Sequence, residues 1–192
     1  MRPLAWAFEF EPERCFEGTR AFTTHGIEKA LFNLFKCFAR LGSERVELES
    51  SRGFEPLKYA DINGYDKGTE LNGWATRRDG GYAVLMYAHH DDWDVNDESA
   101  VHFTLDGLGG DVKQVKIRHY RIDDAHSNAH TEWKRQGSPD WPTEEQYKAI
   151  KAREGLELLC PEYVAHVRGG SISLDFTMPS HGVSFVEVDA AE

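Results

Sequence analysis

The sequence predicts a mainly β protein, an antiparallel β-sandwich that follows one strand and one helix of a different kind. Three observations predict it. Short β-rich runs separated by Gly, Asp, Asn and Pro occupy most of the chain from Arg45 onward. One helical pattern interrupts these runs. The first 41 residues contain one strand and one helix, and both have more apolar residues than elements at the edge of a sandwich need.

Residues 4–10, with the sequence LAWAFEF, are predicted to form the first strand. Leu4, Trp6, Phe8 and Phe10 alternate with residues that are also mostly small and apolar. A strand that is apolar on both faces is typical of a sheet that is covered on both sides, as parallel sheets are.

Residues 27–41 are predicted to form a helix that ends at Gly42. Its apolar stripe consists of Ile27, Leu31, Leu34, Phe35, Phe38 and Leu41. Its polar edge is narrow and consists of Glu28, Lys29, Asn33, Lys36 and Arg40. A helix this apolar requires more partner surface than one strand provides.

Seven runs are predicted to be the strands of the sandwich: residues 45–51, 71–78, 82–90, 100–107, 112–122, 171–177 and 183–188. Asp79-Gly80-Gly81 favours a hairpin turn, and the segment 107–111, GLGGD, is interpreted as another.

A second helix is predicted to begin after Pro142. Thr143 is its expected N-cap, Gln146 completes a capping box, and Gly155 ends it. The boundary between the first strand–helix pair and the sandwich is expected near residues 42–53.

Charge and cysteine usage narrow the functional classes. Asp and Glu outnumber Lys and Arg by 33 to 22, which disfavours a nucleic-acid partner. Cys15, Cys37 and Cys160 form no CxxC pair, so reduced thiols and a cytoplasmic location are expected. The N-terminus lacks the pattern of a secretory signal, and no run has the roughly 18 apolar residues of a membrane helix.

The stretch HYRIDDAHSNAHTEW, residues 119–133, is the first candidate site. His126 and His130 are four residues apart and could share a helical face as metal ligands, joined by His119 and the neighbouring aspartates. Alternatively, Asp and Asn side chains here bind backbone groups and shape a turn. The spacing is weaker than an HExxH motif, and both interpretations remain open.

Other candidates are less specific. His89–Asp94, HHDDWD, is either a cation site or an acidic loop, and it lacks the Gly and bidentate Glu of a calcium loop. Glu9 and Glu11 would point the same way from one strand, so they could touch sugar hydroxyls but could not flank a glycosidic bond. Four tryptophans are candidates for stacking on a sugar or for core positions: Trp74, Trp93, Trp133 and Trp141.

As a set, HYRIDDAHSNAHTEW, GSPDWPTEEQY, MPSHGVSFVEV and the segment LAWAFEF…ARLG resemble the C-terminal part of glycoside hydrolase family 39 β-xylosidases. The resemblance implies that 1–44 is the last β/α unit of a (β/α)8 barrel and that 45–192 is an accessory β-sandwich. It implies that both catalytic Glu residues precede Met1, so none is assigned in this chain. It also implies that Trp6, Glu11 and Glu9 contact the sugar.

The resemblance implies a retaining β-xylosidase that acts on xylosides and xylo-oligosaccharides, without a metal or other cofactor. This chain alone is then expected to be inactive, and it could associate with other copies through its exposed barrel remnant. The alternatives from other classes are a stand-alone carbohydrate-binding β-sandwich and a metal enzyme centred on residues 119–130. By the resemblance, residues 121–133 are a long ordered connection on the sandwich that packs back towards the barrel and could contact a neighbouring subunit, and their polar side chains hold a loop in shape.

Overall fold

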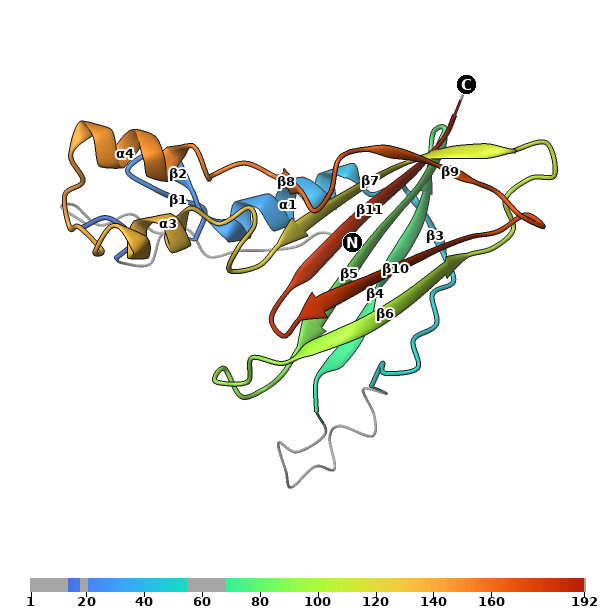
Figure 1. The fold of residues 1–192 in the computed structure, drawn as a ribbon, viewed down its shortest axis with the longest axis horizontal. Coiled ribbons are helices and arrows are strands. Elements are labelled where there is room, and N and C mark those ends of the chain that lie inside the picture. The colour runs from blue at the N-terminus through green and yellow to red at the C-terminus, as the bar shows by residue number, and fades with distance from the viewer. Residues whose placement is uncertain (1–13, 18–20, 55–67, 192) are drawn as a thin grey trace. The chain divides into compact units, whose positions relative to one another are not determined.

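The structure is a computed structural model that describes residues 14–17, 21–54 and 68–191 (Figure 1). The chain forms two compact units. One combines residues 1–40 with 121–157, and the other combines residues 41–120 with 158–192. The segment 121–157 therefore packs with the N-terminal helix rather than with the strands that flank it in sequence. The predicted strand at residues 4–10 lies outside the described residues.

The strand-rich unit holds two antiparallel sheets. The larger sheet has the order β3 (Glu44–Val46), β4 (Glu70–Arg78), β5 (Gly81–His89), β11 (Val183–Ala190), β7 (Gln114–Ile122) and β8 (Glu157–Leu158), and β9 (Tyr163–His166) also pairs with β7. The smaller sheet pairs β6 (Glu98–Leu105) with β10 (Ile172–Pro179). The prediction of a mainly β chain with antiparallel sheets is confirmed.

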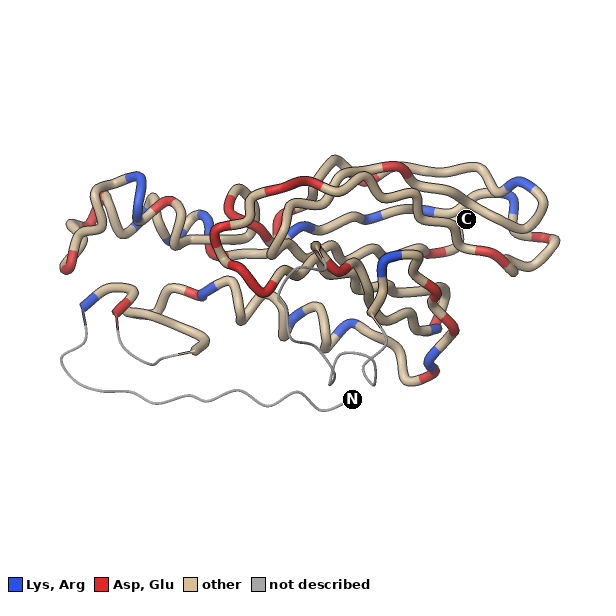
Figure 2. Tube along the Cα trace, turned by 90° about the horizontal axis from the view of Figure 1, so that it is seen from below, with Lys and Arg blue, Asp and Glu red and all other residues tan. Residues whose placement is uncertain are grey.

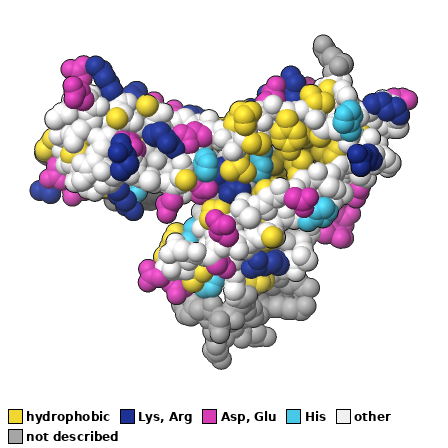
Figure 3. Space-filling model, in the orientation of Figure 1, with side chains coloured by type: hydrophobic (Ala, Val, Ile, Leu, Met, Phe, Trp, Pro, Cys, Tyr) yellow, Lys and Arg dark blue, Asp and Glu magenta, His cyan; other side chains and the backbone are white. Residues whose placement is uncertain are grey.

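The core of this unit lies between the two sheets. Alternate residues of the larger sheet, such as Val84 on β5 and Val186 on β11, share one hydrophobic cluster with Ile172 and Leu174 on β10. Two strands cannot cover a seven-stranded sheet. Hydrophobic side chains accordingly remain visible on the strand-rich unit in Figure 3.

The turn predictions have different outcomes. Asp79 and Gly80 join β4 to β5 as a hairpin, and Gly80 has a φ of 80°, which glycine adopts without strain. The interpretation of Gly107–Asp111 as a hairpin turn is wrong. This segment connects β6 in the smaller sheet to β7 in the larger one, because β6 pairs with β10.

The other unit contains a short β1–β2 hairpin (Thr23–Thr24, Ile27–Glu28) and three helices, α1 (Ala30–Arg40), α3 (Ala129–Arg135) and α4 (Glu144–Lys151). Its core is small: Cys15, Ile27, Ala129 and Ile150 are buried, and aromatic rings pack around them. The capping box of Thr143 and Gln146 is confirmed at the start of α4. Helix α3 was not predicted.

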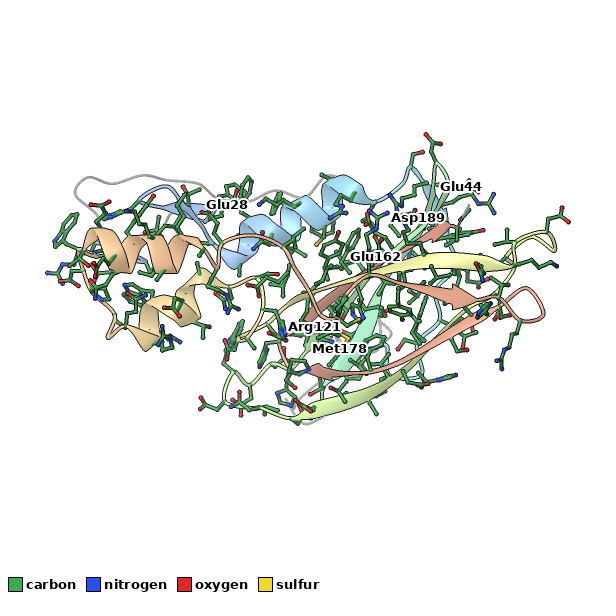
Figure 4. All side chains as sticks on the ribbon, turned by 45° about the horizontal axis from the view of Figure 1, so that its top comes forward. Glu28, Glu44, Arg121, Glu162, Met178 and Asp189 are labelled. Atoms are coloured by element: carbon green, nitrogen blue, oxygen red, sulfur yellow. The ribbon has the colours of Figure 1, made fainter. Side chains whose placement is uncertain are left out.

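Helix α1 starts later than predicted and buries a different face. Ile27 pairs in β2, so the helix begins at Ala30. Its fully buried residues are Asn33 and Cys37, and the prediction that Asn33 lies on the polar edge is wrong. The apolar stripe is only partly buried, and Leu31 is 37% exposed. Lys36 pairs with Glu28, which Figure 4 labels beside this helix.

Charge and helix length also bear on possible partners. Lys and Arg are interspersed with Asp and Glu along the trace of Figure 2, and no continuous basic stripe crosses the described residues. None of the described helices is long and apolar enough to cross a membrane.

Candidate functional site

The residues that the resemblance assigns to sugar contacts, Trp6, Glu9 and Glu11, lie outside the described residues. Their roles therefore stay predictions. The other candidates can be followed in the structure.

In the stretch 119–133, Asp123 organises a turn. Its Oδ1 accepts hydrogen bonds from the backbone N–H groups of Ala125 and His126, both at 2.8 Å, and lies 2.9 Å from His126 Nδ1. Arg121 Nη1 lies 3.5 Å from the other carboxylate oxygen. A carboxylate that accepts two backbone N–H groups is a structural element of a turn. The prediction that polar side chains hold this segment in shape is confirmed.

Ser127 and Asn128 complete the turn and start α3. The Ser127 hydroxyl donates to the Arg121 carbonyl at 2.6 Å and accepts from the Glu157 N–H at 2.8 Å. Asn128 is the N-cap, and its side-chain oxygen accepts from His130 N. The helix therefore begins only after His126, which excludes the helical face that the metal hypothesis gave to His126 and His130.

The three histidines of this stretch have separate surroundings. His119 lies in the strand-rich unit, with Nε2 2.9 Å from the Ser184 hydroxyl and its ring against Phe176. His130 stacks on Trp133, and burial lowers its pKa. No group of three or more His, Cys, Asp or Glu residues that could hold a metal occurs among the described residues.

The side chain of Asn33 connects α1 to the segment 121–157. The sequence pattern did not predict this contact. Its side-chain nitrogen donates to the carbonyls of Ser127 at 2.8 Å and Glu154 at 2.9 Å. Buried carbonyls need such partners, which explains a buried amide on an otherwise apolar helix. An isolated Asn in a helical pattern carries no signal for this role, because its partners lie more than 90 residues away.

A cluster of charged side chains occupies one face of the larger sheet. Glu187, which is 1% exposed, lies 3.5 Å from Arg78 and 3.6 Å from Arg118, and Asp189 pairs with both arginines. Burial opposes the charge of Arg118, but the two carboxylates outweigh it and raise its pKa. Arg118 also pairs with Glu162, labelled with Asp189 in Figure 4. Carboxylates engaged in this way stabilise the sheet rather than serve as an acid/base pair.

A groove of about 660 Å³ opens at the edge of the strand-rich unit. Its walls include Leu48, Leu71 and Tyr82 on one side and His102 and Phe103 of β6 on the other. It reaches core residues such as Val84, so it follows from the incomplete cover that a two-stranded sheet provides.

The loop at His89–Asp94 is held by short-range hydrogen bonds. Asp92 Oδ1 accepts from Asp94 N at 2.9 Å, and His90 Nδ1 accepts from Asp92 N at 3.0 Å. The acidic-loop interpretation of this cluster accounts for these contacts without a cation. The loop also presents Trp93, which is 77% exposed.

The other candidate tryptophans differ in exposure. Trp74 packs near Tyr87, and Trp133 donates from Nε1 to the Pro139 carbonyl at 3.0 Å, so both have structural contacts. Trp141 is 60% exposed and lies 5.3 Å from the ring of His25.

Comparisons with known proteins place these features in a family. The family model described as Glycosyl hydrolases family 39 matches residues 12–158. A search of curated proteins found no match.

Three solved structures share the fold. A bacterial orthologue of human α-L-iduronidase is 21% identical, with a TM-score of 0.70 over 86% of this chain and 28% of that chain. A monomeric β-xylosidase from Caulobacter crescentus CB15 is 17% identical, with a TM-score of 0.68 over 91% and 33%. A family 39 enzyme from Xanthomonas axonopodis pv. citri is 11% identical, with a TM-score of 0.69 over the same shares. The chain thus spans about a third of the length of these structures.

Proposed function

Because this chain belongs to the glycosyl hydrolases of family 39, we propose that it is the C-terminal part of a retaining glycoside hydrolase of the β-xylosidase kind. The observation that carries the proposal is the family match over residues 12–158, which includes the β1–β2 hairpin, α1 and most of the strand-rich unit. The substrate would be a xyloside or xylo-oligosaccharide.

The exposure of α1 supports this assignment of parts. Leu34, Phe35 and Phe38 are only partly buried, although they form the apolar stripe of the helix. An amphipathic helix is stabilised mainly by burial of such a stripe. The proposal supplies the missing partner: the other units of a (β/α)8 barrel, in which residues 4–11 would be the last strand and α1 the last helix.

The position of the β1–β2 hairpin is consistent with a role near the substrate. In (β/α)8 barrels the loops that follow the strands build the active site. Residues 12–29 would be the last of these loops, and the segment 121–157 packs with it in the same compact unit. Its contacts include the Tyr147 hydroxyl, which donates to the His25 carbonyl at 3.2 Å, and Lys151 Nζ, which donates to the Gly26 carbonyl at 2.6 Å.

In the proposed enzyme, catalysis needs two carboxyl groups about 5 Å apart, one a nucleophile and one an acid/base. We assign neither to this chain. Trp6, Glu11 and Glu9 would instead border the sugar and orient it. Chain 1–192 would complete the barrel and carry the sandwich, and alone it would not turn over xylosides.

The experiment is an assay of the pure chain against 4-nitrophenyl β-xyloside and a 4-nitrophenyl uronide, together with the intact mass of the protein from its native source. We expect no turnover and a native mass more than twice 21.8 kDa. Turnover that is abolished by Glu9→Gln or Glu11→Gln would contradict the proposal. A native mass near 21.8 kDa would instead favour a binding or scaffolding role for the chain.

The stand-alone carbohydrate-binding module is the weaker alternative. A sandwich module of that kind has no use for the strand predicted at residues 4–10 or for α1, and the family match extends across both compact units.

A further inference from the structure

An exposed indole ring stands at one end of the strand-rich unit. Trp93 lies in the loop between β5 and β6, and His181 lies in the turn between β10 and β11. Both connections are at the same end of the strands in Figure 1. The two rings stack with centroids 4.8 Å apart and an angle of 21° between their planes. Trp93 is nevertheless 77% exposed, so the stack covers one face of the indole and leaves much of the ring open to solvent.

The two loops that carry these rings are tied together. Ser180, next to His181, donates from its backbone N–H to the Asp97 carbonyl at 2.9 Å, and its hydroxyl bonds the Asp97 carboxylate. The hydrogen bond from Ser180 lowers the pKa of Asp97. Thr69 adds a third anchor, with its hydroxyl 3.0 Å from Asp97 Oδ1. The two loops that carry the rings are therefore joined before any ligand binds, which reduces the entropy lost on binding.

His181 is in an unfavourable state for a residue with only a structural role. Its φ is 64°, in the left-handed region that non-glycine residues rarely adopt, although Gly182 follows directly. Both its ring nitrogens are buried and have no hydrogen-bond partner within the described residues. Strain and unsatisfied polar atoms of this kind concentrate at functional positions. In this structure, the strained backbone of His181 places its imidazole ring flat against the indole ring of Trp93.

We propose that Trp93 on its His181 base forms a binding site for one sugar ring of a neutral oligosaccharide. An exposed, rigid aromatic ring offers a flat apolar surface with a polar edge, which fits a pyranose ring. The ring of His89 lies 6.2 Å from that of His181, and its Nε2 lies 3.2 Å from Asp91 Oδ1, so a histidine and a carboxylate near the stack can bond sugar hydroxyls. This site does not require the proposed hydrolase function.

The negative charge of the residues around Trp93 favours a neutral sugar over an acidic one. Residues 89–98 contain five acidic side chains and no Lys or Arg. Figure 3 shows acidic and histidine side chains at this end of the unit. Like charges repel, so a uronic acid or a sulfated sugar is disfavoured beside these carboxylates. A cationic ligand would be attracted, but cation recognition by aromatic rings typically uses a cage of several rings, whereas the platform here is one indole.

The test is calorimetric titration of the whole chain with three probes: xylohexaose, hexagalacturonate and spermine. We expect binding of xylohexaose, none of hexagalacturonate and none of spermine. Trp93→Ala should weaken xylohexaose binding at least about fivefold, the range expected for losing one stacked ring. Trp93→Phe should retain part of the affinity. Trp141→Ala removes another exposed tryptophan, in the other unit, and should leave the affinity within about twofold of the parent.

Three outcomes would overturn the proposal. The first is no heat with xylohexaose at ~20 mM, a concentration high enough to detect weak sugar binding. The second is xylohexaose binding that Trp93→Ala leaves unchanged, and the third is spermine binding that depends on Trp93, which would make the site a cation receptor. Because the titration needs no turnover, its failure is distinguishable from failure of the hydrolase proposal, which the xyloside assay and the native mass decide.

Discussion

Ser127 is expected to be the most sensitive position in the turn that precedes α3. It is completely buried, and its hydroxyl both donates to the Arg121 carbonyl and accepts from the Glu157 N–H. Ser127→Ala removes the hydroxyl, so both of these buried backbone groups lose this hydrogen bond. A buried backbone group that loses its partner costs about 1–3 kcal/mol, so the expected loss for the two groups is roughly 2–6 kcal/mol in the free energy of unfolding of this unit.

Two substitutions at Ser127 separate the effect of its backbone strain on stability from the effect of its hydrogen bonds. Ser127 has a φ of 54°, so alanine retains the left-handed strain whereas glycine relieves it. Ser127→Gly should therefore be less destabilising than Ser127→Ala by about 1 kcal/mol. Ser138 is the matched control because it has a φ of 53° and is exposed. Ser138→Gly should change stability by no more than about 1 kcal/mol.

The assay is amide hydrogen exchange measured by mass spectrometry on peptides within residues 121–157. A loss of about 2–6 kcal/mol corresponds to exchange that is faster by about 30- to 20,000-fold, at about 1.4 kcal/mol for each factor of ten. The reasoning is refuted if Ser127→Ala and Ser127→Gly both exchange within about twofold of the parent.

Two further predictions concern α3 and α4. Hydrogen bonds from Arg135 and Gln136 lower the pKa of Glu132 to about 2, so its stabilising contribution is present above its ordinary value of 4.5 and is lost as the pH falls from there towards 2. Glu132→Gln should therefore flatten the dependence of stability on pH between about 4.5 and 2, measured by urea unfolding. Glu144→Gln is the control and should leave this dependence unchanged, because the ion pair of Glu144 with Lys148 is exposed. Equal pH profiles for the parent and Glu132→Gln would argue against the effect. Thr143→Ala should destabilise α4 by about 1 kcal/mol in thermal unfolding, because it removes the N-cap side chain, whereas Thr143→Ser should retain the cap. A melting curve of Thr143→Ala that overlays that of the parent would show that the capping box does not stabilise the helix.

Local patterns predicted several elements correctly because their causes are local. The β-rich run at residues 82–90 forms most of β5, and Asp79-Gly80 forms the turn that such a dipeptide favours. Thr143 and Gln146 cap α4 through contacts three residues apart. The bonding of backbone groups by Asp123 and Asn128 is local in the same way. The resemblance identified the family because its motifs lie in the sequence itself.

Other features depended on contacts across long sequence distances. Apart from the resemblance, no local pattern in the segment 121–157 indicates that it packs with residues 1–40, since that grouping rests on contacts such as Asn33 to Ser127 and Asn33 to Glu154. The same contacts bury an Asn that periodicity assigns to the wet edge of α1. Likewise, β6 pairs with β10 rather than with β7, so the loop at 107–111 crosses between sheets.

The sequence by itself determined the family, the β-rich class and the local turns and caps, because each of these is set by residues close together in the chain. The tertiary structure alone decided which of four tryptophans has both an exposed ring and a stacked base. Trp93 and His181 are 88 positions apart, and the pairings of β5 with β11 and of β6 with β10 bring their two loops to the same end of the strands.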